Sequence, residues 1–183
     1  YGSLCGVQNS TGGKSVEIWL EHENRSLTGQ ILGILPGPQV TLIDNFLSAA
    51  EAAHLIQKAT PNLAAATVWE DGTFKPANYR SSTTSWLQDD DNDPILSQLL
   101  QRIESVTGLS LETAEQLQIA HYASESHGHY EPHYDWGKAT NHWKTGEPQG
   151  DRVATMLMYL NDVESGGSTV FTALHLTVQP RLG

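Results

Sequence analysis

The sequence is poor in cysteine and in basic residues, and it contains no long apolar run. Cys5 is the only cysteine among 183 residues, which excludes a scaffold held together by internal disulfides. With 10 Lys and Arg against 21 Asp and Glu, the formal net charge is −11, and this argues against nucleic-acid binding through the phosphate backbone. No apolar run approaches the roughly 18 residues that span a bilayer, so we expect no membrane insertion.

The remaining composition is that of a folded domain. The chain is 38% hydrophobic, with 5 Trp and 6 Tyr, and its 17% of charged residues is too low to indicate disorder. Two sequons for N-linked glycosylation begin at Asn9 and Asn24. They are weak evidence for the secretory pathway, because such tripeptides also arise by chance.

The chain divides into two zones. Residues 1–38 are rich in Gly, Ser and Asn and close on Leu35-Pro-Gly-Pro38, which favours a linker or a loosely attached strand or two. Residues 39–183 carry the regular hydrophobic patterns that we expect of one folded domain. The net negative charge of the whole chain favours neutral or cationic peptides over acidic ones as partners.

Two helices are predicted near the start of the domain. The sequence from Ser48 to Glu51 is a capping box, and it predicts a helix that ends near Ala59. Asp93 followed by Pro94 predicts the start of a second helix, which we expect to end at Gly108.

Strands are expected on both sides of these helices. They share short apolar patterns with period two, bounded by turn residues, and lie at 39–46, 115–122, 130–135, 152–160, 168–171 and 174–178. This order predicts an α+β fold with a sheet-on-sheet jelly roll and supporting N-terminal helices.

The tripeptide His133-Tyr134-Asp135 is the strongest chemical signal in the chain. On a strand, side chains alternate between faces, so His133 and Asp135 would point the same way and could hold one ion. One imidazole and one carboxylate make two thirds of the 2-His-1-carboxylate triad of non-haem Fe(II) oxygenases. A third ligand is expected from a distant strand.

Several motifs in the right order resemble one family. They are Tyr79-Arg-Ser-Ser-Thr-Thr-Ser-Trp-Leu87, Tyr130-Glu-Pro-His-Tyr-Asp135, Arg152-Val-Ala-Thr155, Tyr159-Leu-Asn-Asp-Val163 and Gly166-Gly-Ser-Thr-Val-Phe171. The chain resembles the prolyl 4-hydroxylases, most closely the catalytic domain of the collagen-type α subunit. The resemblance implies a double-stranded β-helix core and hydroxylation of peptidyl proline at C4 in procollagen-type substrates. It also implies Fe(2+), 2-oxoglutarate, O2 and L-ascorbate as cofactors, the endoplasmic reticulum lumen as location, and protein disulfide isomerase as a possible partner.

The same resemblance suggests roles for single residues. His133 and Asp135 match the family's iron ligands, while Tyr130 and Thr169 match positions beside 2-oxoglutarate. The blander alternatives are an aromatic core residue for Tyr130 and an ordinary β-branched strand residue for Thr169.

Three further residues resemble positions near the family's peptide groove. Arg80 and Ser82 match its substrate-side segment, and Tyr122 could stack on a proline ring. Their alternatives are a surface arginine and a strand aromatic. The spacing from Tyr122 to His133 is two residues longer than the family pattern, which weakens that assignment.

The chain also departs from the family pattern. The turn at Pro180 to Gly183 matches, but the family's distal iron-binding His and the Lys that pairs with 2-oxoglutarate follow beyond it. We therefore expect a domain that lacks its last strands and shows little activity alone. His175 falls where the family has no ligand, and His127 and His129 are expected on an exposed turn.

Two other functions stay open. The first is a shortened, non-catalytic form that binds a peptide or a partner protein. The second is an unrelated hydrolytic site, for instance one with zinc, although zinc hydrolases present three protein ligands and a base that no pattern here supplies.

Overall fold

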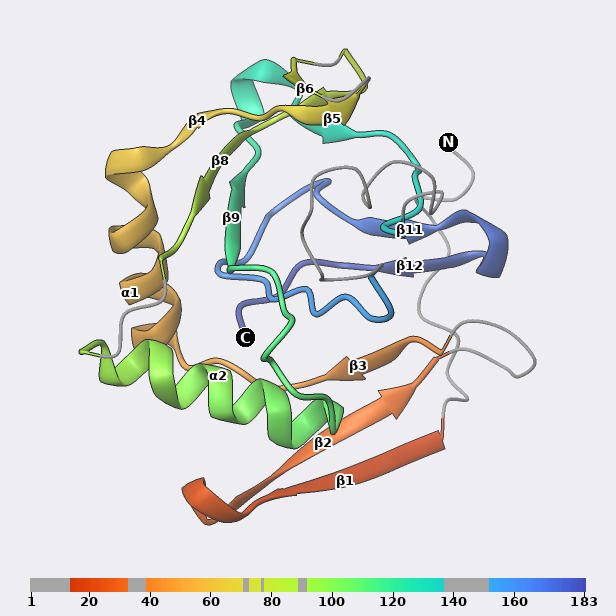
Figure 1. Ribbon diagram of the computed structural model, residues 1–183. Coiled ribbons are helices and arrows are strands. Elements are labelled where there is room, and N and C mark those ends of the chain that lie inside the picture. The colour runs from red at the N-terminus through yellow and green to blue at the C-terminus, as the bar shows by residue number, and fades with distance from the viewer. Residues whose placement is uncertain (1–13, 33–38, 71–72, 77, 89–91, 137–151) are drawn as a thin grey trace. The chain divides into compact units, whose positions relative to one another are not determined.

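The computed structural model describes residues 14–32, 39–70, 73–76, 78–88, 92–136 and 152–183 (Figure 1). All strand pairs in this part of the chain are antiparallel, and two α-helices accompany them. The coarse expectation of mixed helices and antiparallel sheets is thus confirmed. The described strands do not close into a barrel. No helix in these ranges is long and apolar enough to cross a bilayer.

The chain forms two compact units. The first comprises the described parts of 1–54, 101–108 and 158–183, and the second those of 55–100 and 109–157. The strands of the first unit are β1 (Lys14–Leu20), β2 (Arg25–Ile31), β3 (Thr41–Ile43), β11 (Thr169–Phe171) and β12 (Leu176–Val178). They pair as a three-stranded sheet, β1-β2-β3, and as a hairpin of β11 and β12.

The second unit holds three small sheets. Its strands are β4 (Ala64–Ala65), β5 (Val68–Glu70), β6 (Thr73–Lys75), β7 (Arg80–Ser81), β8 (Thr83–Trp86), β9 (Gln118–His121) and β10 (His129–Tyr130). They pair in the orders β4-β8-β9, β5-β6 and β10-β7. The last pair is short, yet it carries most of the candidate site.

The N-terminal zone contains a regular hairpin. Strands β1 and β2 pair along seven residues each, and β2 also pairs with β3. Leu20 and Leu27 are fully buried, while Trp19 is 57% exposed on the other face. Asn24 takes a left-handed conformation (φ 50°) at the turn, which Asn tolerates better than most residues. The sequence predicts a linker or loosely attached strands for residues 1–38. In the described part of this zone, the chain forms paired strands. The domain boundary at residue 38 stays a prediction.

Both helices begin where their capping signals predict. In α1 (Ala49–Ala59), the Glu51 carboxylate accepts a bond from the Ser48 N–H at 2.7 Å, and the Ser48 hydroxyl accepts one from the Glu51 N–H at 3.2 Å. In α2 (Pro94–Thr107), Asp93 Oδ1 accepts the N–H groups of Ile95 and Leu96 at 3.1 Å. These bonds satisfy backbone donors that a helix leaves free at its N-terminus.

Each helix buries one stripe of side chains. In α1 the stripe is Ala52, Leu55 and Ala59, and in α2 it is Leu96, Leu99, Arg102 and Ile103. The spacing of three and four residues is that of one helix face. Gly108 ends α2 in a left-handed conformation (φ 68°), as expected of a glycine at that position.

Several predicted strands are shorter than expected or absent. The strand expected at 130–135 ends at Tyr130, because Pro132 has no N–H to donate and restricts the residue before it. Residues 152–160 form no ladder with any described strand, so that expectation is wrong. The strand expected from Leu174 begins at Leu176 instead, because His175 takes a left-handed conformation (φ 51°) after a 3-10 turn.

Candidate metal centre and peptide groove

The site is built on the two-residue ladder between β7 and β10. Arg80 lies opposite Tyr130, and Ser81 lies opposite His129. The N–H of Glu131 donates to the Tyr79 carbonyl at 2.9 Å and extends the ladder by one bond. This ladder fixes the segment that leads into the predicted metal ligands.

His133 and Asp135 converge from a loop, not from a strand as predicted. Nε2 of His133 lies 3.2 Å from Oδ1 of Asp135. Nδ1 of His133 lies 2.8 Å from the Glu131 carbonyl oxygen, which can only accept, so Nδ1 carries a proton and donates. When the imidazole is neutral, its Nε2 lone pair is therefore left to face Asp135. This is the tautomer that a metal ion needs.

The separation of the two groups fits a shared metal ion. Two ligands at about 2.1 Å from one ion and at right angles to each other lie about 3 Å apart. The observed 3.2 Å between Nε2 and Oδ1 is close to that value. The side chains of His133 and Asp135 are 38% and 39% exposed, so an ion could reach them from solvent. One nitrogen and one carboxylate oxygen form a donor set that suits Fe(II).

Two residues hold Asp135 in place. The Thr155 hydroxyl donates to Oδ2 at 2.6 Å, which leaves Oδ1 for His133 or an ion. A guanidinium nitrogen of Arg152 lies 3.5 Å from the Asp135 carbonyl oxygen. Arg152 also forms a two-pronged ion pair with Glu115, and the hydrogen bonds of that pair raise the pKa of Arg152. Sequence reasoning noticed the motif Arg152-Val-Ala-Thr155 but assigned it no role.

Tyr130 lies between the predicted peptide residues and the metal ligands. Its ring stacks on the His133 ring with 3.7 Å between centroids and 20° between planes. The guanidinium carbon of Arg80 lies over the Tyr130 ring at 4.8 Å from its centroid. Burial raises the pKa of Tyr130, and Arg80 opposes that shift only in part. The phenol therefore stays protonated at neutral pH and can donate a hydrogen bond.

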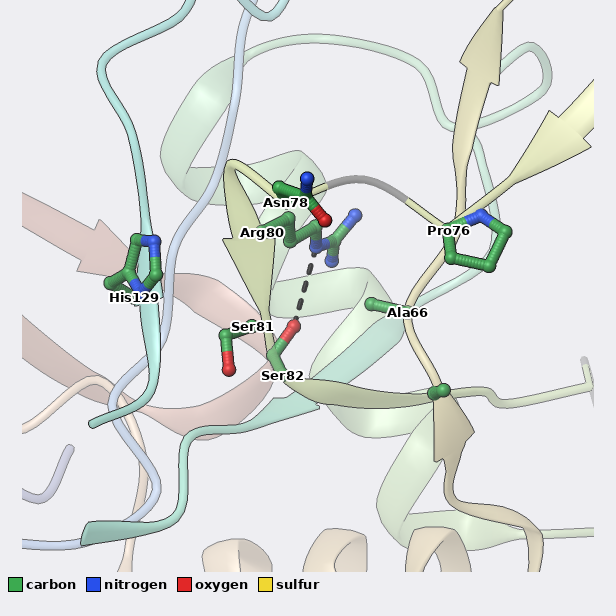
Figure 2. A pocket seen from close by; sticks show the side chains of 8 residues that line it. Ala66, Pro76, Asn78, Arg80, Ser81, Ser82 and His129 are labelled. Carbon is green, nitrogen blue, oxygen red and sulfur yellow. Dashed lines mark hydrogen bonds between the residues drawn. The ribbon is translucent and has the colours of Figure 1, made fainter. Parts of the chain in front are cut away.

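An open groove of about 480 Å³ lies beside β7 (Figure 2). Arg80 and Ser82, both predicted to contact peptide, line it, and their side chains are joined by a hydrogen bond of 3.3 Å. Ala66, Pro76 and His129 contribute to its walls. Tyr122, the third predicted peptide residue, is 43% exposed and is not among the lining residues.

The match to known proteins covers this region. Residues 117–183 match the family model described as the 2OG-Fe(II) oxygenase superfamily. This part of the chain is thus similar to that superfamily. The superfamily's name carries Fe(II), the metal expected from the His133 and Asp135 pair, and 2-oxoglutarate, the cosubstrate that the family resemblance implies.

The curated relatives to which the chain is similar are alpha subunits of prolyl 4-hydroxylases. It is 39% identical over 148 residues to prolyl 4-hydroxylase subunit alpha-2 of Gallus gallus, and 38% identical over 149 residues to subunit alpha-1 of Rattus norvegicus. It is 37% identical over 147 residues to subunit alpha-2 of Caenorhabditis elegans. The matches cover 78–80% of this chain but only 26–27% of the relatives, so the chain spans about a quarter of their length.

The C-terminal part of the superfamily match, residues 158–183, lies in the first compact unit. There the phenol of Tyr159 lies 2.6 Å from the hydroxyl of Thr169, the predicted cosubstrate residue. Burial raises the pKa of Tyr159, while its bond to Thr169 lowers it in part. Tyr159 was not singled out from the sequence. Its place in the motif Tyr159-Leu-Asn-Asp-Val163 was the available signal.

The remaining candidates are not gathered at the metal ligands. In the described part of the chain, no group of three or more His, Cys, Asp and Glu could hold a metal ion. His127 and His175 each end a 3-10 turn with positive φ, as turn residues do. Asn24 is exposed, whereas Asn9 lies outside the described residues.

Proposed function

We propose that this chain supplies the iron and peptide sites of a dioxygenase that hydroxylates peptidyl proline at C4. The observation that carries the proposal is the pair of His133 Nε2 and Asp135 Oδ1, 3.2 Å apart, in the tautomer that metal binding requires. The match of residues 117–183 to the oxygenase superfamily and the similarity to prolyl 4-hydroxylase subunits support it. We also propose the double-stranded β-helix of that superfamily as the complete core.

Separate sets of residues are proposed to bind the metal, the cosubstrate and the peptide. Fe(II), when bound, supplies the activation of O2 with 2-oxoglutarate as electron donor, and L-ascorbate would keep the metal reduced. His133 and Asp135 hold the ion, while Thr155 keeps the carboxylate oriented. The Tyr130 phenol donates to a carboxylate of 2-oxoglutarate. The proposed role of Thr169 beside the cosubstrate rests on its match to the prolyl 4-hydroxylase motif.

The groove along β7 receives the proline-containing, procollagen-type peptide. Its guanidinium and hydroxyl groups, from Arg80 and Ser82, can donate to the carbonyl groups of an extended chain. The small side chain of Ala66 leaves room beside them for a pyrrolidine ring. Tyr122, exposed outside the groove, could stack on a neighbouring proline.

A non-catalytic, shortened form that binds a peptide or a partner protein is the second candidate. It is favoured by the absence of a third metal ligand near His133 and Asp135 within the described residues. With two ligands among the described residues, the chain should bind Fe(II) weakly and turn over little 2-oxoglutarate alone. Turnover at the rate of a full-length prolyl 4-hydroxylase subunit would contradict that expectation.

We further propose that the protein works in the lumen of the endoplasmic reticulum, with protein disulfide isomerase as a possible partner. Asn24 is the glycosylation candidate within the described residues, and it is exposed at a hairpin turn. Expression in secretory cells, with a mass shift that enzymatic deglycosylation removes and Asn24→Gln reduces, would support this location.

The decisive experiment is an anaerobic titration with Fe(II) and 2-oxoglutarate, followed by the weak visible charge-transfer band of such complexes. We expect a saturable band that His133→Ala and Asp135→Ala abolish and that His121→Ala, at an exposed position on β9, leaves unchanged. A band unaffected by the first two substitutions would overturn the iron site. Binding of a proline-rich peptide that is indifferent to metal, with no band at all, would favour the non-catalytic candidate.

A further inference from the structure

We propose that Arg80 is a positioning residue for the metal ligand His133 and acts through the ring of Tyr130. Occupancy of the peptide groove and affinity for the metal ion are then coupled. This inference rests on the proposed function, because it takes His133 as a ligand and the groove as the peptide site.

The three side chains form a stacked column. The His133 ring covers one face of the Tyr130 ring at 3.7 Å between centroids, which leaves no room there for a second group. We infer that the Arg80 guanidinium, at 4.8 Å from the same centroid, lies over the opposite face. The Tyr79 ring also stacks on Tyr130, with 6.5 Å between centroids. A cation over a phenol ring is attracted by its π electrons, and two near-parallel rings restrict each other's rotation.

The outer end of the column is anchored and also faces the groove. The Arg80 guanidinium donates to Gln118 Oε1 on β9 at 2.8 Å and to the Ser82 hydroxyl at 3.3 Å. Arg80 lines the groove with Ser82 (Figure 2). A peptide carbonyl that accepts a hydrogen bond from the Arg80 guanidinium would therefore alter the contact between that guanidinium and the Tyr130 ring.

The inner end of the column has few other restraints. The side chain of His133 is 38% exposed, so burial in a core does not hold its ring. Its Nδ1–H bond to the Glu131 carbonyl sets the tautomer, and the Tyr130 ring sets the plane. A ring that is free to turn would present Nε2 to an ion for a smaller fraction of the time, and metal affinity would fall accordingly.

The coupling has a thermodynamic signature. If peptide binding raises metal affinity by some factor, the metal must raise peptide affinity by the same factor. Residues that act through one column are also non-additive: once the Tyr130 ring is removed, the loss of the Arg80 charge should have no further effect on metal binding.

The test measures Mn(II) binding by the electron paramagnetic resonance signal of the free ion, with and without a proline-rich peptide. We expect Arg80→Met to weaken Mn(II) binding by about 5-fold, Arg80→Lys to restore part of it, and Tyr130→Phe to leave it unchanged. Tyr130→Leu should weaken it at least as much as Arg80→Met, and adding Arg80→Met to Tyr130→Leu should change nothing more. Circular dichroism confirms that each variant is folded.

Thr28→Val, exposed on β2 and outside both proposed sites, is the control that should leave Mn(II) and peptide binding unchanged. If Arg80→Met weakens the peptide but leaves Mn(II) binding unchanged, Arg80 is only a peptide contact and the column is refuted. If Mn(II) binding in the unaltered chain does not depend on His133, the proposed iron site itself has failed. The two failures are thus distinguishable.

Discussion

The carboxylate of Asp135 uses its two oxygens differently, and this difference can be tested at a single residue. Oδ2 accepts the Thr155 hydroxyl at 2.6 Å, while Oδ1 faces His133. Thr155→Val keeps the β-branched shape but removes the donor, so Asp135 can rotate. Loss of such a supporting bond costs about 10-fold or more in metal affinity. We expect Thr155→Val to lose that much affinity for Mn(II), and Thr28→Val, on the exposed face of β2, to lose none.

Unlike Asp135, Ser85 has a side-chain polar group with no hydrogen-bond partner among the described residues. It lies on β8, is 4% exposed, and its hydroxyl oxygen forms no hydrogen bond with the described residues. A buried hydroxyl without a bond costs free energy, so Ser85→Ala should be neutral or stabilising by up to about 1 kcal/mol. Urea unfolding of Ser85→Ala measures this change in unfolding free energy. Ser105→Ala is the control, because the Ser105 hydroxyl donates to the Gln101 carbonyl. A loss of stability in Ser85→Ala beyond that of the control would mean that the hydroxyl is needed.

At the scale of elements, one buried cation joins three segments of the first unit. Arg102 on α2 is 2% exposed, and it donates to Glu51 on α1 at 2.6 Å and to Glu23 beside the β1–β2 turn at 2.5 Å. It also donates to the Phe46 carbonyl at 2.6 Å. These bonds add charged contacts between two helices and a hairpin to the apolar packing that the same elements make.

Removal of that cation should be severe. Arg102→Met leaves two largely buried carboxylates without their partner, which costs about 3–5 kcal/mol of unfolding free energy. Arg25→Met is the matched control, because Arg25 pairs with the same Glu23 but is 37% exposed, and exposed pairs contribute about 0–1 kcal/mol. Equal losses in both variants, measured by urea unfolding, would show that Arg102 is not the organising residue.

Local signals explain which elements the sequence predicts. The capping box at Ser48 and the Asp93-Pro94 pair act within four residues, so both helices begin where predicted. The predicted strand through His133 ends early because Pro132 interrupts it, although His133 and Asp135 still lie close together, as alternation predicted. Residues 14–31 form a hairpin whose polar composition resembles a linker, because its stability depends on pairing and on a few buried leucines.

The supporting residues of the site could not be predicted in the same way. Thr155 is 20 positions from Asp135, and Arg80 is 50 positions from Tyr130. A motif can draw attention to such residues, as it did for Arg80, but their contacts depend on how distant segments meet. The proposed ligand pair lies within three residues, so local sequence was sufficient to predict that His133 and Asp135 lie together.

At the scale of the whole molecule, the Arg102 network should set the resistance to acid. Burial alone raises the pKa of Glu51, but hydrogen bonds with Arg102 and with Ser48 outweigh it and lower that pKa to about 2. The pKa of Glu23 is also lowered, because its bonds with Arg102 and Arg25 outweigh the effect of burial. A carboxyl group whose pKa is lower in the folded state than in the unfolded chain contributes stability above its ordinary pKa of 4.5. That contribution disappears as the pH falls from there toward 2.

Glu51→Gln isolates this contribution from the general effect of acid on a chain with a net charge of −11. At about pH 7 the variant should be less stable, because the amide cannot pair with Arg102 as an anion does. Between about pH 4.5 and pH 2 its stability should fall less steeply than that of the unaltered protein, since one fewer proton is taken up on unfolding in that range. Urea midpoints across these pH values measure both effects, and the exposed Glu17→Gln on β1 serves as the control. Parallel curves for the unaltered protein and Glu51→Gln would show that acid sensitivity originates in other carboxylates.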